Sequence, residues 1–300
     1  MIKICIFVFL FFIIISIFFL KSQESPVLES FENFEKPKCK IAIATQVRRP
    51  IDFPLWLKYH RNLGICMFYI RCEDSPGTVE YLRTIPNDDI FIEEGESDRS
   101  GNNYMTVMDR QNTFVNKSIN LAKEKGIDWM INIDCDELLY GSLAIFDDLP
   151  QNIKTIHMKN IEAVYDGNEN SCFSAKKFLR CAESAPCRAY ANGKGAGRVE
   201  DGVALAGPHF FSYNGKIGGD TNEDLPEDKF KVLHFDSCTF GSWAEKFKHL
   251  SNNKKDPIPF PYYTKSIENV TSGFDIYKRY TMDAIKNVAD TLITTIDPIY

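Results

Sequence analysis

Three carboxylates stand within four residues of one another, directly after a short apolar segment. Asp134, Asp136 and Glu137 follow residues 129–133, which read Trp-Met-Ile-Asn-Ile. Carboxylates this close repel one another, and a hard divalent cation removes that penalty because it prefers oxygen ligands. Where the backbone turns at the end of a strand, side chains at i and i+2 can both reach one ion. A cation held there would bridge the two phosphates of a nucleotide diphosphate and neutralise charge on the leaving group.

The segments around this cluster alternate between apolar strands and amphipathic helices. We expect strands at 39–47, 66–71, 89–93 and 129–133, with helices between them at 53–63, 77–85 and 104–125. Repeated strand–helix–strand units predict a mostly parallel sheet with helices on both faces, the α/β class. Ligands bind such sheets beyond the carboxyl ends of the strands. The acidic cluster is therefore expected at the rim where binding takes place.

The alternation weakens after about residue 150. Strands are expected at 154–159, 209–213 and 231–235, a loop-like stretch at 173–207, and helices at 242–250 and 274–294. No change in composition marks a second domain. This half is expected to supply the acceptor side of a single domain.

The N-terminus carries a long apolar run. From Ile4 to Leu20 only Ser16 is polar, and Lys3 and Lys21 flank the run. A bilayer-spanning helix needs about 17 to 25 such residues. No pair of small residues suggests a cleavage site, which favours an uncleaved signal anchor over a cleaved signal peptide. Either one sends the rest of the chain into the secretory lumen, and the anchor predicts a single-pass type II membrane protein of the Golgi or endoplasmic reticulum.

These features predict four segments along the chain. They are a signal anchor at 1–21, a polar stem at 22–38, a catalytic domain at 39–255 and a C-terminal helical extension at 256–300. The formal net charge of -6 argues against a nucleic-acid partner, because phosphate binding requires a basic face.

Cysteines and glycosylation motifs are compatible with the secretory lumen. Cys172, Cys181 and Cys187 lie in one loop-rich stretch, where a disulfide is plausible and zinc is a weaker alternative. The pairing cannot be deduced from the sequence. Sequons begin at Asn116 and Asn269, and the first falls in an expected helix.

Several short motifs resemble glycosyltransferase family 92 and related family 2 proteins. Asp134-Cys-Asp136-Glu137-Leu, preceded by Asp128-Trp129, resembles the Asp-x-Asp-Glu-Phe segment of that family. Further similar pieces, in the same order, are Trp56 to His60 with Leu63-Gly64, Phe68 to Ile70 with Ser75, Arg110-Gln111, and His234-Phe235 with Phe240, Trp243 and Lys246. Pro54-Leu55 replaces the acidic lead-in that the family has before the first of these pieces. The resemblance covers roughly residues 40–250.

The resemblance implies a GT-A-type fold and a hexosyltransferase with a nucleotide-sugar donor, a glycan or glycoprotein acceptor, and Mn²⁺ or Mg²⁺. It also implies inversion at the anomeric carbon. Asp136 is then the first metal ligand, and Asp134 contacts the metal or the donor ribose. A third ligand comes from late in the chain in this fold. His234 fits by motif, with His209 as its rival, although a histidine beside aromatic residues is often part of the core.

Further roles concern proton transfer and the donor. An inverting displacement needs a general base, for which Glu200-Asp201 or Asp236 are candidates, each with a solvated carboxylate as the simpler alternative. Lys194 and Arg198 flank a glycine-rich loop and are candidates for the diphosphate. The resemblance implies that three further residues line the base and ribose pocket: Thr45, Arg48 and Gln111.

Two other functions and one structural alternative compete with a transferase. A haloacid-dehalogenase-like phosphatase also ends an apolar strand in Asp-x-Asp, but at its first strand rather than after three others. A non-catalytic, membrane-anchored sugar-binding protein would not need the acidic cluster. The cluster itself could be a solvated acidic turn. Substitution of Asp136 by alanine distinguishes these possibilities through its effect on metal-dependent turnover.

Overall fold

The computed structural model describes residues 35–97, 103–167, 171–185, 187–251, 274–283 and 285–297. The expected anchor at 1–21, the stem up to residue 34 and the sequon at Asn269 lie outside these ranges. No helix within the described ranges has the length and apolarity needed to cross a bilayer.

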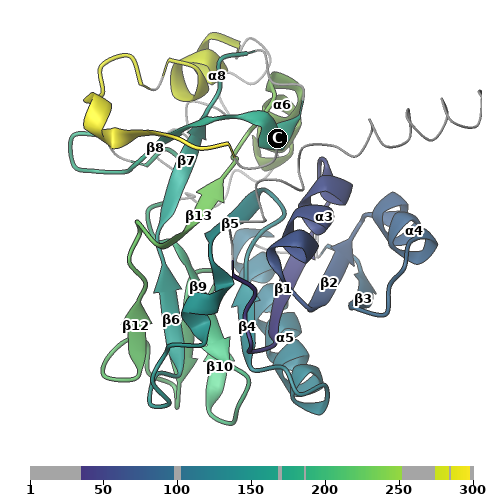
Figure 1. Ribbon diagram of the computed structural model, residues 1–300. Coiled ribbons are helices and arrows are strands. Elements are labelled where there is room, and N and C mark those ends of the chain that lie inside the picture. The colour runs from purple at the N-terminus through teal and green to yellow at the C-terminus, as the bar shows by residue number, and fades with distance from the viewer. Residues whose placement is uncertain are drawn as a thin grey trace, which may run out of the picture.

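Two sheets form the centre of the molecule (Figure 1). The larger has seven strands in the order β12-β6-β9-β4-β1-β2-β3. Its bounds are β1 Ile41–Val47, β2 Met67–Glu73, β3 Ile90–Gly95, β4 Trp129–Asn132, β6 Thr155–Met158, β9 Lys194–Arg198 and β12 Asn222–Asp224. Strands β3, β2, β1 and β4 are parallel, whereas β9 runs antiparallel to both β4 and β6. The expected α/β class, with a large sheet flanked by helices, is confirmed, and the sheet is mixed.

The second sheet has five strands in the order β14-β8-β7-β13-β5. Its bounds are β5 Glu137–Gly141, β7 Asn160–Val164, β8 Lys177–Leu179, β13 Phe230–His234 and β14 Ile293–Thr295. The chain crosses from the large sheet to this one three times: between β4 and β5, at Lys159 between β6 and β7, and between β12 and β13. The residues that follow β4 therefore lie where the two sheets meet.

Helices cover both faces of the parallel strands. Alternate residues of β1 face opposite clusters, because side chains in a strand alternate with a period of two. Ile41 and Ile43 pack with α3 (Phe53–Leu63) and α4 (Pro76–Thr84), whereas Ala42 and Ala44 pack with α5 (Asn103–Glu124). Since both faces of β1 and β4 are covered, these two strands are almost entirely buried, whereas the edge strand β3 is half-buried and carries Glu93 and Glu94.

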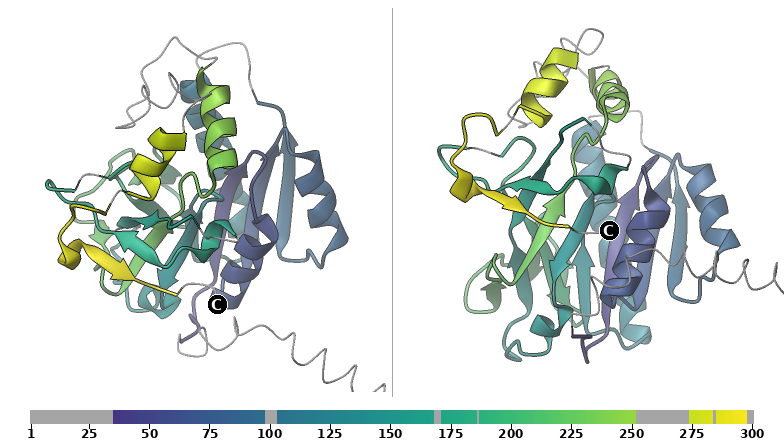
Figure 2. Two further views of the ribbon diagram at one scale, coloured as in Figure 1. Left: turned by 90° about the horizontal axis from the view of Figure 1, so that it is seen from above. Right: turned by 45° about the horizontal axis from the view of Figure 1, so that its top comes forward.

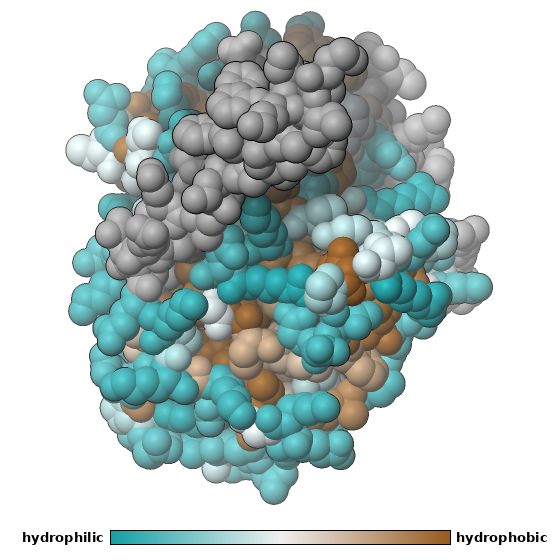
Figure 3. Space-filling view, turned by 45° about the vertical axis from the view of Figure 1, so that its right-hand side comes forward, coloured by the Kyte–Doolittle hydropathy of each residue, from teal (hydrophilic) through white to brown (hydrophobic). Residues whose placement is uncertain are grey.

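Two short helices lie together beside the second sheet. These are α6 (Phe240–Ser251) and α8 (Phe274–Thr281), which lie side by side in the ribbon views (Figures 1 and 2). The rings of Trp243 and Tyr277 contact each other between them. The face in Figure 3 is mostly hydrophilic over its described part, with apolar side chains near its centre.

The sequence-based prediction was wrong in several places after residue 150, and β7 and β12 were not expected at all. The stretch expected as loop, 173–207, contains β8, β9 and β10 (Val203–Leu205), which pairs with β11 (Phe211–Tyr213). Strand β9 reads Lys-Gly-Ala-Gly-Arg, and a Cβ on Gly197 would lie 2.5 Å from Val203 and 2.6 Å from Phe211. The glycines that suggested a loop are therefore needed for close packing of a strand. The expected helix 274–294 ends at Thr281 and is followed by the short helix η3 (Asp290–Leu292) and β14.

Two disulfides join cysteines of the second half. Cys181 pairs with Cys187, within the stretch where a disulfide was expected. Cys172 pairs with Cys238, a partner that lies 66 residues away and that spacing did not indicate.

The first sequon is engaged in the fold. The Asn116 side chain on α5 accepts a hydrogen bond of 2.7 Å from the backbone N–H of Leu205, and Ser118 is fully buried.

Candidate active site

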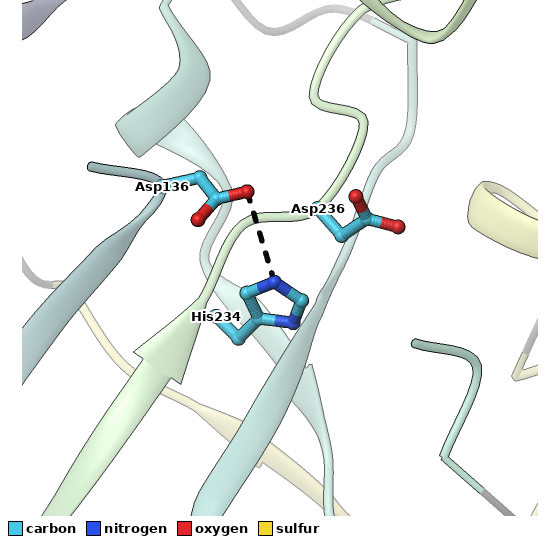
Figure 4. A group of neighbouring side chains, drawn as sticks. All are labelled: Asp136, His234 and Asp236. Atoms are coloured by element: carbon cyan, nitrogen blue, oxygen red, sulfur yellow. Dashed lines mark ion pairs between the residues drawn. The ribbon is translucent and has the colours of Figure 1, made fainter. Parts of the chain in front are cut away.

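A carboxylate, an imidazole and a second carboxylate form a compact group where the two sheets meet. They belong to Asp136, His234 and Asp236, and one ligand atom of each lies within 4.8 Å of the other two (Figure 4). The Nε2 atom of His234 lies 3.8 Å from Oδ2 of Asp136. In the view of Figure 4 the Asp136 carboxylate faces this ring, whereas the Asp236 carboxylate points to the side. The three residues offer two oxygen ligands and one nitrogen ligand.

The strand pairing of the second sheet holds two of these side chains. Strand β13 runs antiparallel to β5, with His234 opposite Glu137, and the N–H of Phe235 donates to the Asp136 carbonyl at 2.8 Å. Asp136 stands immediately before β5, and His234 is the last residue of β13. Both residues are therefore fixed by the end of one antiparallel ladder.

Helix α3 fixes the other strand of this ladder. Trp56 donates from Nε1 to the Glu137 carbonyl at 2.8 Å, and Tyr59 donates from its hydroxyl to the Leu139 carbonyl at 2.7 Å. The N–H of Leu139 donates to Nε2 of His60 at 3.3 Å. Burial lowers the pKa of His60 to about 3, so this ring is a neutral acceptor at ordinary pH. The Trp-x-x-Tyr-His helix is thus a structural support of the site.

Behind His234 lies a buried carboxylate that the sequence reading missed. Glu162, on β7, is almost fully buried and lies 3.7 Å from Nδ1 of His234. Its oxygens accept from the N–H groups of Arg188 at 2.6 Å and Ala189 at 2.9 Å, and its pKa is lowered because His234 and Arg188 outweigh the effect of burial. A carboxylate facing the second ring nitrogen is the usual partner of a metal-ligating histidine. The sequence signal for Glu162 would have been a single acidic residue within the otherwise largely apolar segment Asn-Ile-Glu-Ala-Val.

The surrounding carboxylates make His234 basic. Burial alone would lower its pKa, but Glu162, Asp136, Asp236 and Glu137 outweigh burial and raise the pKa to about 9. Lys246 on α6 forms an ion pair with Asp236. In the absence of a metal, therefore, protonated His234 and Lys246 balance the charge of the group.

Metal binding is expected to release a proton from His234. A ligating imidazole must be neutral, so the affinity for Mn²⁺ should rise about tenfold per pH unit between roughly pH 6.5 and 8.5, below the pKa of about 9. Calorimetry near pH 7.5 in two buffers with different ionisation enthalpies counts the protons, and about one is expected. A count near zero would contradict this arrangement. By the same linkage, the raised pKa stabilises the metal-free fold below about pH 6.5, and this contribution is lost as the pH rises through about 9.

Asp134 and Glu137 belong to a second group, in which one buried lysine offsets part of their charge. Lys194 is fully buried on β9, and its Nζ lies 2.5 Å from Asp134 and 3.3 Å from Glu137. Glu137 also accepts from the hydroxyl of Tyr190, and its Oε2 accepts from the N–H of Asp134 at 2.7 Å. Burial raises the pKa of Glu137 to about 7, and the pKa of Asp134 is lowered because Lys194 outweighs the effect of burial. The ion pair with Lys194 therefore reduces the repulsion between these two carboxylates, for which the sequence had suggested a shared cation.

His209 lies beside this second group and outside the three-ligand group. Its Nδ1 is 2.8 Å from the Gly193 carbonyl, and its ring packs against Tyr190 at 4.8 Å between centroids. Burial and the charge of Lys194 lower its pKa to about 4. His209 is therefore a neutral ring at ordinary pH. The ring of His234 also contacts Tyr190, at 4.7 Å between centroids, so Tyr190 packs against both histidines.

Glu200 and Asp201 lie far from the ligand group. Strand β9 starts at Lys194, beside Asp134, and ends at Arg198, opposite Trp129. At the usual rise per residue, the two ends of the strand are about 14 Å apart. Glu200, beyond that end, pairs with Lys154, and Asp201 pairs with Lys123.

Arg198 is occupied at the same end of the strand. It donates to the backbone carbonyls of Leu149, Pro150 and Ile153, and it stacks on Trp129. The structure thus brings Asp236 to the site. It leaves Glu200, Asp201 and Arg198 at the opposite end of the strands, near the start of β4.

Polar residues also gather after β1 and β2. Thr45 is fully buried, and its hydroxyl has no hydrogen-bond partner among the described residues. Arg48 lies 3.4 Å from Asp74, which also accepts from the Ser97 hydroxyl at 2.5 Å. On α5, Gln111 donates to Asp134 at 3.3 Å. These side chains lie along the carboxyl ends of neighbouring parallel strands, so Thr45, Arg48, Gln111 and Asp134 share one rim.

One strong ion pair at this rim was not anticipated. Arg110 on α5 holds Glu73 at the end of β2 through two hydrogen bonds of 2.6 and 3.0 Å. This bidentate contact ties the start of the long helix to the second strand.

The fold and the site define a mixed α/β protein with a candidate divalent-metal group at the rim of its parallel strands. No protein-family model matches the chain. The chain is 25% identical to "Glycosyltransferase-like At2g41451" of Arabidopsis thaliana, in a match covering 75% of this chain and 60% of that protein. It is 23% identical to "Glycosyltransferase-like At3g57200" of the same plant, over 72% of this chain and 52% of that protein. These relatives support a glycosyltransferase in general.

The chain spans a little over half the length of these curated relatives. Among solved structures, Rv0371c from Mycobacterium tuberculosis H37Rv gives a TM-score of 0.26 with 9% identity, over 42% of this chain and 67% of that one. A similarity this low has no bearing on fold or function.

Proposed function

We propose that this protein is a metal-dependent glycosyltransferase that transfers a hexose from a nucleotide diphosphate sugar to a glycan or glycoprotein. The observation that carries the proposal is the group formed by Asp136, His234 and Asp236 at the rim of the parallel strands. The names of the two relatives support the same general class. The GT-A type and the likeness to family 92 remain part of this proposal.

The ligand group fits Mn²⁺ or Mg²⁺ in its chemistry. Carboxylate oxygens suit both ions, and an imidazole nitrogen suits Mn²⁺ better. Ligands about 2.1 Å from an octahedral ion lie about 3 Å apart in cis positions and about 4 Å apart in trans positions. The observed spacing of up to 4.8 Å is slightly longer, so cation binding would be accompanied by a small side-chain movement. A bound cation would act as a Lewis acid on the diphosphate leaving group.

The protein's own residues would orient the donor beside this group. The buried hydroxyl of Thr45 and the pair formed by Arg48 and Asp74 suit a nucleoside, because both offer hydrogen-bonding atoms at the ends of adjacent strands. Asp134, held by Gln111 and Lys194, suits the ribose rather than the metal. Lys194 is already paired with Asp134 and Glu137. It is therefore a weaker candidate for the diphosphate than its place beside a glycine-rich stretch suggested.

An inverting transfer would need a base for the acceptor hydroxyl. Of the three carboxylates considered, Asp236 alone belongs to the ligand group, whereas Glu200 and Asp201 pair with lysines at the far end of β9. We therefore propose Asp236 for this role, through the carboxylate oxygen that does not meet the cation.

We further propose a luminal, membrane-anchored protein of the Golgi or endoplasmic reticulum. The apolar run from residue 4 to 20 supports the anchor. The two disulfides support an oxidising compartment.

Thermal unfolding with a panel of nucleoside diphosphates tests the donor class. At 100 times its dissociation constant, a ligand of the folded state stabilises by about 2.7 kcal/mol, and the unfolding midpoint should rise by about 5–10 °C. We expect this shift for one nucleoside diphosphate in the presence of Mn²⁺, with little or no shift when EDTA replaces the metal. The nucleotide that gives the shift identifies the base of the donor.

Two outcomes would count against the proposal. A shift that is equal with and without metal would separate nucleotide binding from the ligand group. Metal-dependent release of phosphate from a phosphomonoester, without turnover of any nucleotide sugar, would favour a phosphatase instead.

A further inference from the structure

Two of the three proposed metal ligands are fixed by strand pairing, and the third is not. His234 ends β13, and the N–H of Phe235 makes the last contact of the ladder, 2.8 Å from the Asp136 carbonyl. Asp236 lies one residue beyond this contact. Its position therefore depends on whatever holds the chain after β13.

A disulfide holds the chain two residues later. Ser237 adopts a left-handed conformation with φ of 57°, and Cys238 is bonded to Cys172. Both cysteines are about 95% buried. The hydroxyl of Tyr277 donates to the Cys238 carbonyl at 3.3 Å, which fixes the same point from α8. Asp236 thus sits on a short span between the ladder and a covalent anchor.

The other half of the disulfide is tied to helix α3. Asp52, just before α3, accepts hydrogen bonds of 2.8 Å from both the Cys172 N–H and the Ser171 hydroxyl. The same helix holds β5, the strand that follows Asp136, through Trp56. Helix α3 and the residue before it therefore support both β5, which follows Asp136, and the segment that carries Cys172.

We infer that the Cys172–Cys238 disulfide, braced by Asp52 just before α3, is a positioning element that holds Asp236 within reach of the metal. This inference rests on the proposed function, because it assumes that the ligand group binds a divalent cation. Without the disulfide, Asp136 and His234 keep their ladder. Asp236 loses the covalent anchor of its chain and keeps only the hydrogen bond of Tyr277 to the residue 238 carbonyl and its own ion pair with Lys246. The expected consequence is loss of one ligand out of three.

A double-mutant cycle with Mn²⁺ as the probe tests this inference. The affinity is measured by calorimetry for the wild type, Cys172→Ala/Cys238→Ala, Asp236→Ala, and the variant that combines all three substitutions. We expect the disulfide variant to bind Mn²⁺ about 10-fold more weakly, in the range seen when residues that orient ligands are changed. In the Asp236→Ala background, removal of the disulfide should change the affinity by less than about twofold, since the ligand that it positions is already absent.

Cys181→Ala/Cys187→Ala is the control, because it removes a disulfide that borders Arg188, on the Glu162 side of His234, rather than Asp236. Any loss of affinity that it causes should be the same with and without Asp236. Its affinity should fall less than that of the Cys172→Ala/Cys238→Ala variant. An unchanged affinity without the Cys172–Cys238 disulfide would overturn the inference. So would the same fold-loss with and without Asp236.

A second variant covers the case in which removal of the disulfide prevents folding. Asp52→Ala keeps the disulfide and removes two hydrogen bonds that brace it. Asp52→Ala should also weaken Mn²⁺ binding, by a smaller factor than the Cys172→Ala/Cys238→Ala variant. The effect should again be seen only when Asp236 is present. An Asp52→Ala affinity equal to that of the wild type would overturn the inference. Failure of the wild type to bind Mn²⁺ would instead refute the proposed function.

Discussion

Replacement of Asp136 by alanine is expected to lower Mn²⁺-dependent turnover of the nucleotide sugar by at least about 100-fold. The carboxylate lies 3.8 Å from His234 at the end of the ladder, so its loss removes one of the three proposed ligands. The variant should also lose the metal-dependent part of the nucleotide-induced rise in unfolding temperature. Turnover and thermal unfolding are measured on the same preparations.

Asp148→Ala serves as the control for this substitution. Asp148 is exposed and follows η1 (Leu143–Phe146), next to Asp147, which accepts from the N–H groups of residues 38 and 39 before β1. This position is at the amino end of the parallel strands, away from the ligand group. We expect full turnover from Asp148→Ala. Comparable turnover from Asp136→Ala would show that this carboxylate does not take part in the reaction.

Replacement of Lys194 by methionine is expected to destabilise the fold by about 3–5 kcal/mol, the usual cost of removing one partner from a buried ion pair. Lys194 is fully buried and balances both Asp134 and Glu137. Urea denaturation measures the free energy of unfolding. Lys154→Met is the matched control, because its pair with Glu200 is partly exposed and should contribute less than about 1 kcal/mol.

The loss of stability in Lys194→Met should depend on pH. Burial already raises the pKa of Glu137 to about 7, and removal of the lysine raises it further because the lysine favours the charged form. The folded variant then holds a proton that the unfolded chain releases above its ordinary pKa, so its stability falls as the pH rises. The deficit relative to the wild type should shrink between pH 8 and pH 5. A deficit that is the same at both values would contradict the assigned charges.

The parallel half of the fold could be predicted from the sequence because its strands carry a strong local signal. β1, β2, β3 and β4 are short apolar runs separated by helices, and their carboxyl ends carry polar residues such as Thr45 and Asp134. The approximate position of the site follows from this pattern alone.

The second sheet could not be predicted, because its strands are short and distant in sequence. β5 pairs with β13, about 90 residues later, and β14 pairs with β8. No local pattern encodes such pairings. The glycines of β9 indicated a loop, although Gly197 is required for contact with Val203 and Phe211.

The same limits apply to the candidate site. Asp136 and His234 were predicted as ligands, and the structure brings them together with Asp236, which had been considered as a base. Glu162 was missed because β7 was not recognised as a strand. Glu200 and Asp201 form an acidic pair and were candidates for the general base. Because β9 runs antiparallel to β4, its end carries them to the amino end of the parallel strands, away from the ligand group.

The central claim is that Asp136, His234 and Asp236 bind one divalent cation. Anomalous diffraction from crystals soaked in Mn²⁺ and a nucleoside diphosphate measures this directly. The account predicts one manganese peak in contact with Nε2 of His234 and with a carboxylate oxygen of each aspartate. A peak held by Asp134 and Asp136 without His234, or no peak near these residues, would contradict it.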